Sequence, residues 1–370
     1  MAENIITKQR KRRVRDRQLL RFRVSKGEAF EIPVEQEDLR LADKDGIYEA
    51  LSSRKIHSIT QHYQKVERHP VDMLCLFYTV MISILLLAFH KNVSNWAHIL
   101  LTNLLLIVAT MELVRLVSIR SSNRFLGFVR VMYPAVYLAW GWNALNSLVP
   151  IFFGNYWATE LIIAADKFIF GVHPTVWFQQ FHNPLLDELM CTFYTGYYLF
   201  MPLIILSFFF CGKKKEALVV FSLATFTYFV NFFLFYLLPA VGPQMVNNLD
   251  GFGTNTFTGY HIANLLRHLQ ENGCVTGAAF PSSHISGSII WSLATKKYAP
   301  KWGNMLLIFT IGVAVSTVYL GYHHAMDAIF GFTLGTLCYR VGGLFLRKEM
   351  ISVDFFSKTG KFIKNNGRLK

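Results

Sequence analysis

Two short stretches in the C-terminal half of the chain hold residue types that transfer protons and attack electrophiles. The first, residues 281–284 (PSSH), ends at His284, and the second runs from His323 to Asp327. On a helix, residues four apart share a face, so we expect the Asp327 carboxylate to accept a proton from one ring nitrogen of His323. Such a partner fixes the tautomer and makes the other nitrogen a better nucleophile. His324 is expected to point away from Asp327.

The residues before His284 have the pattern of a helix start. Ser282 or Ser283 can cap this helix, which leaves backbone N–H groups and the positive end of the helix dipole free. A helix end of this kind binds anions. We therefore expect an anion site at this helix N-terminus, with His284 in the first turn beside it.

Composition places these residues in a membrane protein. The chain has 370 residues, 53% hydrophobic and 16% charged, whereas roughly 25% of residues are charged in an average soluble domain. Apolar runs of about twenty residues match a helix that crosses about 30 Å of hydrocarbon. The net charge of +14 lies mainly in the tails and short loops, as in cytoplasmic segments, so we expect no nucleic-acid partner. The five cysteines show no CxxC spacing, which argues against a zinc site or a disulfide framework.

The apolar runs predict an all-α integral membrane protein with about eight transmembrane helices. The expected spans are residues 71–89, 94–118, 127–152, 187–211, 215–239, 283–298, 302–322 and 326–346. They divide the chain into a basic cytoplasmic arm (1–69), two additional helices (70–126), a six-helix core (127–346) and a basic cytoplasmic tail (347–370). The arm is polar and strongly basic, so no cleavable signal peptide is expected.

Positive charge in the connections predicts the orientation. Lys and Arg gather in both tails and in the second, fourth and sixth connections, and the other connections carry few. Because cytoplasmic loops are enriched in Lys and Arg, an even number of helices with both termini in the cytoplasm fits every loop. This puts His284 and His323 together on the periplasmic, lumenal or extracellular side. We expect a bacterial inner membrane in preference to a eukaryotic organelle.

Two long connections on that side, 153–186 and 240–281, are expected to contain further helices. Residues 157–170 show helical apolar spacing with charged residues interleaved, which is typical of an amphipathic helix in the membrane interface. Residues 171–175 are expected to end it, and a second short helix is expected over 260–271. Both loops would then place helices on the side that carries the histidines.

The two stretches resemble motifs of a known family. Residues 280–287 (FPSSHISG) are similar to the second motif of the type 2 phosphatidic acid phosphatase superfamily, and residues 319–327 (YLGYHHAMD) are similar to its third, with HxxxD intact. The resemblance implies a six-helix core, matched here by the helices from residue 127 onward. Residues 235–244 occupy the place of the first motif. The segment 171–175 (GVHPT) and the FPSxHxSG form look more like the inositol phosphorylceramide synthase branch.

The resemblance implies a reaction through a phosphohistidine. His323 would attack phosphorus, and Asp327 would orient it. Ser282, Ser283 and the helix N-terminus would hold phosphate oxygens. His284 would protonate the leaving alkoxide and then activate water or an acceptor hydroxyl. The expected protein is thus a membrane-embedded lipid phosphotransferase or phosphatase. Its partners would be a phospholipid substrate, a lipid alcohol acceptor and the bilayer, and no cofactor or metal is implied.

The sequence departs from this family at its cationic positions. The first motif normally supplies a Lys and an Arg, near which Phe235 and Gly242 stand here, and Thr317 stands where the third motif has an Arg. A dianionic monoester would be poorly neutralised without these charges, which favours a diester and transfer of the phospho head group. Further phosphate-binding candidates are the outer-loop cations Arg267 and Lys167 and the neutral donors Gln244 and Tyr319.

Three other functions remain open at this point. One is hydrolysis of phosphatidate-like monoesters. The second is a metalloenzyme, because His284, His323 and Asp327 have the composition of a two-histidine, one-carboxylate metal site. The third is a non-enzymatic lipid transporter, whose expected marks are an inverted repeat or several intramembrane charges. The sequence has no evident repeat and few such charges.

Overall fold

The protein divides into two units, Met1–Val66 and Glu67–Lys370. This computed structural model describes residues 17–23, 29–35, 68–119, 123–246 and 257–347. In the first unit, strands β1 (Arg17–Arg23) and β2 (Ala29–Glu35) pair as an antiparallel hairpin. The all-α prediction therefore holds for the described part of the second unit and missed the hairpin of the first. The rest of the predicted arm, and the predicted tail beyond residue 347, lie outside the described residues.

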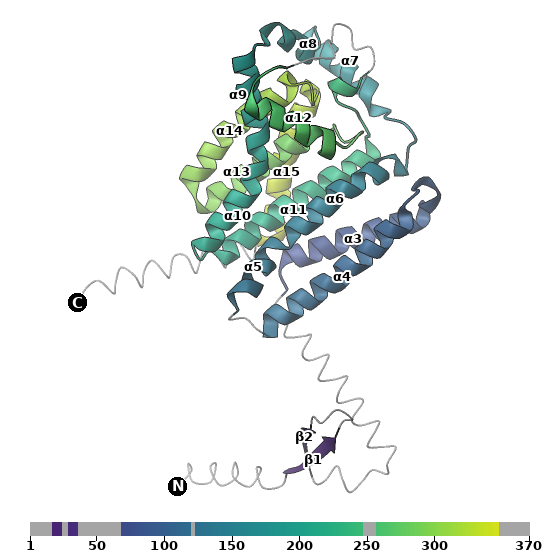
Figure 1. The fold of residues 1–370 in the computed structure, drawn as a ribbon, viewed down its shortest axis with the longest axis vertical. Helices are drawn as coiled ribbons and strands as arrows, with labels where there is room; N and C mark the ends of the chain where they lie inside the picture. Colours follow the sequence, from purple (N-terminus) through teal and green to yellow (C-terminus); the bar gives the residue numbers. More distant parts are fainter. Residues whose placement is uncertain (1–16, 24–28, 36–67, 120–122, 247–256, 348–370) are drawn as a thin grey trace, which may run out of the picture. The chain divides into compact units, whose positions relative to one another are not determined.

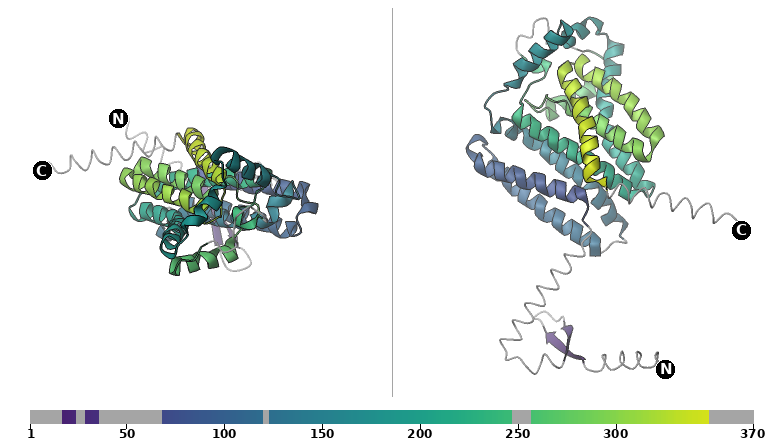
Figure 2. Two further views of the ribbon diagram at one scale, coloured as in Figure 1. Left: turned by 90° about the horizontal axis from the view of Figure 1, so that it is seen from above. Right: turned by 180° about the vertical axis from the view of Figure 1, so that it is seen from behind.

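The second unit is built from helices joined by turns and longer loops (Figure 1). Its α-helices are α3 (Pro70–Ala88), α4 (Trp96–Ile119), α5 (Arg124–Met132), α6 (Pro134–Leu148), α7 (Ala158–Phe170), α8 (Pro174–Phe178), α9 (Pro184–Gly196), α10 (Phe200–Phe210), α11 (Lys214–Leu237), α12 (His261–Gly273), α13 (Ser283–Tyr298), α14 (Pro300–Tyr319) and α15 (Ala325–Phe345). Its 3₁₀ turns are η1 (His90–Asn92), η2 (Val149–Ile151), η3 (Gln179–Phe181), η4 (Tyr197–Leu199) and η5 (Pro243–Met245). The long helices lie side by side, and α7, α8 and α12 gather at one end of the bundle (Figures 1 and 2).

Six helices among the described residues are long and apolar enough to cross a membrane. They are α3, α4, the continuous segment α9–η4–α10 (Pro184–Phe210), α11, α14 and α15. Large apolar side chains on them are exposed, such as Phe77 on α3 and Ile308 on α14, at 70% and 71%. Such outward-facing apolar surface requires a hydrocarbon solvent, so the chain is an integral membrane protein.

Helices occupy all eight predicted positions, but two of them do not meet the requirements of a full span. The predicted run 127–152 is divided at Pro134 into α5 and α6, because proline interrupts the helical hydrogen-bond ladder. Helix α13 has 16 residues, or about 24 Å, which is shorter than the roughly 30 Å of hydrocarbon. The helices α7 and α8–η3, bent by 62° at residues 171–173, would add a seventh span if they cross together.

Helix α13 is short because it lies inside the bundle, packed against α11, α14 and α15 (Figure 1). Every residue from Ser283 to Ser292 is buried. A Cβ atom on Gly331 of α15 would lie 2.6 Å from the Ser282 carbonyl oxygen, and one on Gly335 would lie 2.7 Å from that of Ser286. Glycine thus permits the backbones of α13 and α15 to touch. A helix enclosed by other helices need not match the thickness of the bilayer. The N-terminus of α13 can therefore lie inside the protein.

Two carboxylates of α9 attach α12 to the end of the bundle. Glu188 accepts hydrogen bonds from three backbone N–H groups at the start of α12, those of Tyr260, Ile262 and Ala263. Asp187 accepts from the Thr258 N–H at 2.7 Å and from the Tyr319 hydroxyl of α14 at 2.6 Å. Carboxylates at a helix N-terminus stabilise it through the helix dipole. These bonds hold α12 over the end of the bundle at which α13 begins.

A buried ion pair attaches the first of the two additional helices to the core. Asp72 of α3 accepts hydrogen bonds from both terminal nitrogens of Arg130 on α5, at 2.6 and 2.5 Å, and from the Tyr133 hydroxyl. Asp72 also closes a capping box with His69 at the start of α3. Losing one member of a buried pair leaves an uncompensated charge, so the pair fixes α3 against α5.

Substitution of Gly335 tests the close packing of α13 and α15. The new Cβ of Gly335→Ala would meet backbone atoms of Ser286 within 3.0 Å, which cannot move without shifting α13. We expect destabilisation of about 1–3 kcal/mol, the usual cost of overpacking, seen as a lower midpoint of thermal unfolding in detergent. Gly343→Ala on the same helix is the control, since nothing lies within 4 Å of its Cβ. Equal midpoints for the two variants would contradict this packing.

Candidate active site

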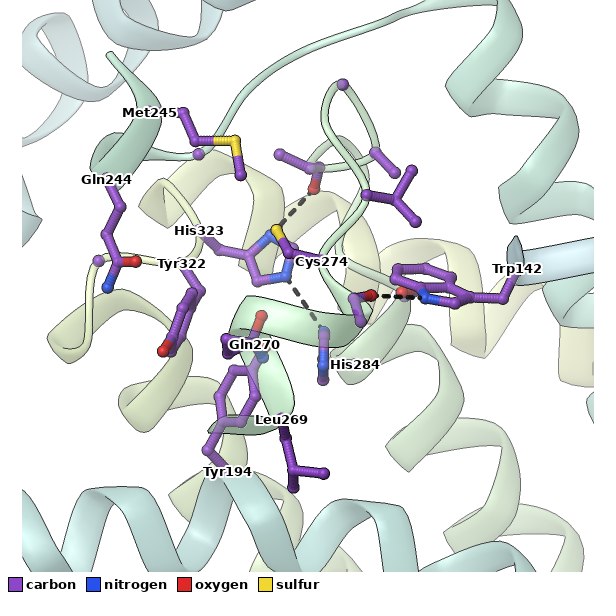
Figure 3. A pocket seen from close by; sticks show the side chains of 18 of the residues that line it. Trp142, Tyr194, Gln244, Met245, Leu269, Gln270, Cys274, His284, Tyr322 and His323 are labelled. Atoms are coloured by element: carbon purple, nitrogen blue, oxygen red, sulfur yellow. Dashed lines mark hydrogen bonds between the residues drawn. The ribbon is translucent and has the colours of Figure 1, made fainter. Parts of the chain in front are cut away.

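A cavity of about 1360 Å³ lies between α12 and the N-terminus of α13 (Figure 3). Its polar part contains Ser283, His284 and His323. Its apolar part is lined by side chains from α6, α11, α12 and the following loop, namely Leu138, Trp142, Phe232, Leu269 and Val275. The cavity therefore offers one region for a charged or hydroxylated group and another for hydrocarbon.

His284 and His323 face each other in this cavity (Figure 3). Nδ1 of His284 lies 3.2 Å from Nε2 of His323, although the residues are 39 apart in sequence. His284 stands in the first turn of α13, and His323 lies in the turn before α15. Only 7% and 4% of the two residues are exposed. The structure thus brings the two predicted stretches together.

The second ring nitrogen of His323 has two acceptors. Its Nδ1 lies 3.0 Å from the Ala279 carbonyl oxygen and 3.4 Å from the Asp327 carboxylate. Because a carbonyl oxygen only accepts, Nδ1 carries the proton and Nε2 presents its lone pair to His284. We predicted that His323 and Asp327 share a helix face, and this is wrong because α15 begins at Ala325, after His323. The backbone carbonyl that is the nearer acceptor has no sequence signal.

Two carboxylates occupy the N-terminus of α15. Asp166 of α7 accepts hydrogen bonds from the first two backbone N–H groups of the helix, at 3.0 and 2.8 Å. Asp327 accepts from the His324 N–H at 2.8 Å. His324 closes a capping box with Asp327, and its Nε2–H donates to the Val241 carbonyl at 3.3 Å. The expectation that His324 points away from Asp327 is therefore wrong, and its role is to cap the helix.

The N-terminus of α13 has no carboxylate in its first turn. Its backbone N–H groups there lack intrahelical partners, as at every helix start. Ser282 is the N-cap, but its hydroxyl makes no capping bond, in contrast to our expectation. This hydroxyl is fully buried and has no hydrogen-bond partner among the described residues. The free helix end, the unpartnered hydroxyl and the cavity-lining Ser283 together have the properties of an anion site.

Three tyrosines of the segment α9–η4–α10 surround His284. The ring centroids of Tyr194 and Tyr197 lie 4.6 and 5.0 Å from that of His284. The hydroxyl of Tyr198 lies 3.2 Å from Nε2 of His284. Sequence reasoning missed these residues, although positions 194, 197 and 198 lie on one helix face within an apolar run. A polar aromatic stripe with this spacing was the signal available.

The other four phosphate-binding candidates lie in different places. Gln244 lines the cavity, and its amide donates to a carbonyl of the turn before His323 at 2.6 Å. Arg267 also lines the cavity and donates to two backbone carbonyls before α12, at 3.1 and 3.2 Å. Tyr319 is buried with its hydroxyl on Asp187, and Lys167 is exposed on α7. The described cavity lining includes neither of these last two.

Packing residues occupy the positions at which the resembled family has cations. Phe235 is fully buried in the core. A Cβ on Gly242 would lie 2.2 Å from the Tyr322 carbonyl oxygen. The carbonyl of Thr317 accepts from the N–H groups of Tyr322 and His323, both at 3.1 Å. Gly242 and Thr317 thus shape the turn that carries His323. Burial raises the pKa of the Tyr322 phenol in this turn, so the phenol stays neutral.

Known proteins show sequence similarity to this part of the chain. Residues 160–341 match the sequence model of the PAP2 superfamily. A PA-phosphatase related-family protein of Dictyostelium discoideum is 29% identical over 129 residues, which is 34% of this chain. The chain spans 23% of that relative's length. No solved structure matches the chain. The matched residues include both histidines and Asp327.

Proposed function

We propose that this membrane protein is a lipid phosphotransferase that forms a phosphohistidine at His323. The observation that carries the proposal is the contact between Nδ1 of His284 and Nε2 of His323 beside the free N-terminus of α13. Nε2 of His323 presents a lone pair to the substrate. His284 lies where a proton must be given to the leaving group and later taken from the acceptor. The helix end next to them binds the phosphate oxygens that gain negative charge.

The reaction has two steps that use the same groups in opposite directions. Phosphorus enters between the two rings, so the 3.2 Å contact opens when substrate binds. Nε2 of His323 forms a bond to phosphorus, and the bond to the leaving alkoxide breaks as that oxygen takes a proton from the protonated His284. An acceptor hydroxyl then gives its proton to His284, attacks phosphorus and releases His323. Asp327 and the Ala279 carbonyl hold the opposite nitrogen of His323 throughout.

Charge in the cavity favours a phosphodiester donor. Arg267 is the only Lys or Arg in the described cavity lining, and its bonds to backbone carbonyls fix it on α12. A phosphomonoester brings up to two negative charges, and a diester brings one. A site with one arginine and neutral donors such as Gln244 and Ser283 suits the single charge. Transfer of a phospho head group to a lipid alcohol, as in the inositol phosphorylceramide synthase branch, is thus preferred to hydrolysis.

The shape of the cavity favours a lipid substrate. Trp142, Leu138 and Phe232 line its apolar part, and His284 and His323 lie at its polar part. A lipid phosphoester has the same division between hydrocarbon and charge. Together with the six spanning helices, this supports a bilayer lipid as donor. The predicted topology, with cytoplasmic termini, places the reaction in the outer leaflet.

The alternatives have less support. A phosphatase that hydrolyses phosphatidate-like monoesters would use the same histidines, with water as acceptor. The similarity to a PA-phosphatase related-family protein of Dictyostelium discoideum favours this alternative. A metal site is disfavoured because Asp327 and His284 lie on opposite nitrogens of His323. Among the described residues no group of three or more His, Cys, Asp or Glu converges on one point. If the protein were a transporter, the contact between His284 and His323 would have no function.

Labelling of the full-length protein tests the phosphohistidine. Purified protein in detergent is mixed with phospholipids that carry ³²P in the head group and is quenched during turnover. We expect an acid-labile, alkali-stable label in the wild type and none in His323→Ala. His268→Ala, an exposed histidine of α12 outside the described cavity lining, should be labelled like the wild type. Labelling of His323→Ala at the wild-type level would show that this nitrogen is not the nucleophile.

A lipid panel separates transfer from hydrolysis. Phosphatidate, phosphatidylglycerophosphate and phosphatidylinositol are each supplied with and without ceramide as acceptor. We expect phosphatidylinositol to yield diacylglycerol and a phosphorylated ceramide, because a diester carries the charge that Arg267 alone can balance. The monoesters should react more slowly. Free phosphate as the only product, whether or not ceramide is present, would refute the transferase and leave the phosphatase.

A further inference from the structure

The ring of His284 is held from its far side by one hydroxyl group. Among the described residues, its ring nitrogens have two hydrogen-bond partners, Nε2 of His323 on Nδ1 and the Tyr198 hydroxyl on Nε2. Both distances are 3.2 Å. The first contact must open to admit phosphorus, so the bond to Tyr198 is the one that remains during the reaction.

The Ala279 carbonyl determines which ring nitrogens of His323 and His284 carry protons. The Ala279 carbonyl accepts from Nδ1 of His323, so Nε2 of a neutral His323 carries no proton. The contact with His284 then requires Nδ1–H on His284 as the donor. A neutral His284 in this tautomer has a bare Nε2, which accepts from the Tyr198 hydroxyl. Tyr198 therefore holds Nε2 of His284 on the far side of the ring, which keeps Nδ1–H facing His323.

A tyrosine hydroxyl suits both protonation states of His284. It donates to Nε2 when the ring is neutral in the resting site, and it accepts from Nε2–H when the ring is protonated. The rings of Tyr194 and Tyr197, with centroids 4.6 and 5.0 Å from that of His284, are tilted by 37° and 52° to the same ring. Burial lowers the pKa of His284, and the attraction of aromatic rings for a cation offsets part of this effect when the ring is protonated.

The backbone that carries Tyr198 is fixed on both sides. Tyr198 lies in the 3₁₀ turn η4, between α9 and α10. At the end of α9, a Cβ on Gly196 would lie 2.6 Å from the ring of Phe309 on α14, so the two helices touch there. Tyr197 bonds through its hydroxyl to that of Tyr228 on α11. A 3₁₀ turn inside a span is unusual, and here it presents two adjacent tyrosines to one histidine.

We propose that Tyr198 is a positioning residue that reserves Nδ1 of His284 for proton transfer. This inference rests on the proposed function of His284 as the acid/base group. In the first step, the protonated His284 gives its Nδ1 proton to the leaving oxygen, and its Nε2–H remains on the Tyr198 oxygen. In the second step, the bare Nδ1 takes the proton of the acceptor hydroxyl. Without Tyr198 the ring can adopt the other tautomer or rotate, which places the wrong nitrogen at phosphorus.

Solid-state NMR of the full-length protein in lipid bilayers tests the tautomer without any substrate. The protein is labelled with ¹³C and ¹⁵N at histidine, and the His284 signals are identified as those lost in His284→Gln. We expect the Nδ1–H pattern in the wild type and a shift to the Nε2–H pattern in Tyr198→Phe. Tyr197→Phe is the matched control, because it keeps its ring beside that of His284 and loses a hydroxyl that bonds to Tyr228. An Nε2–H pattern in the wild type, or no shift in Tyr198→Phe, would overturn the proposal.

Kinetics test the consequence for proton transfer. With the phospholipid donor found in the lipid panel, Tyr198→Phe should lower kcat about 10- to 100-fold with little change in KM, within the usual contribution of acid–base catalysis. With the 4-nitrophenyl ester of the same phospho head group, the burst of 4-nitrophenol should change less than about threefold, because this leaving group needs no proton. Equal losses with both donors would assign Tyr198 a structural role only. If no lipid in the panel reacts, the proposed function fails, and the NMR result still decides the role of Tyr198.

Discussion

Contact between the backbones of α13 and α15 is the constraint on which the site depends. Their N-terminal ends are joined by the hydrogen bond from the Ser282 N–H to the Asp327 carbonyl, at 3.0 Å. Gly331 and Gly335 allow the approach, since any side chain there would overlap the backbone of α13. His284 follows one of these helix ends and His323 precedes the other, so the distance between the helices sets the distance between the rings. Small residues at a helix interface are commonly a packing device in membranes, and here they also determine the chemistry.

The N-termini of α13 and α15 differ in how the positive end of the helix dipole is neutralised. Asp166 and Asp327 neutralise that of α15 inside the protein. The first turn of α13 has no acidic residue, and its N-cap hydroxyl has no partner among the described residues. A negatively charged phosphate is therefore directed to α13 and kept from α15 by like charge. This arrangement places the anion beside His284 and leaves Nε2 of His323 to approach it.

Much of the architecture could be predicted from the sequence because its signals are local. Apolar runs located most of the long helices to within a few residues, and the helical spacing of apolar residues located α7. The PSSH and HxxxD patterns identified the histidine pair. The depth of α13 could not be predicted, because it depends on the helices that enclose it and not on its own residues. Asp327 lies beside one ring nitrogen of His323 as expected, but the expected shared helix face is wrong because spacing alone does not show where a helix begins. The Ala279 carbonyl, Asp166 and Tyr198 act through tertiary contacts, and only the tyrosine stripe left a pattern in the sequence.

The central claim is that Nε2 of His323 attacks a phosphoester held at the N-terminus of α13. The most direct measurement is an experimental structure of the full-length protein with orthovanadate, which adopts the geometry of phosphoryl transfer. The account predicts vanadium bonded to Nε2 of His323, with its oxygens on the first backbone N–H groups of α13 and Nδ1 of His284 facing the opposite oxygen. Vanadate bound elsewhere in the cavity, with the 3.2 Å contact between the two histidines still closed, would contradict it.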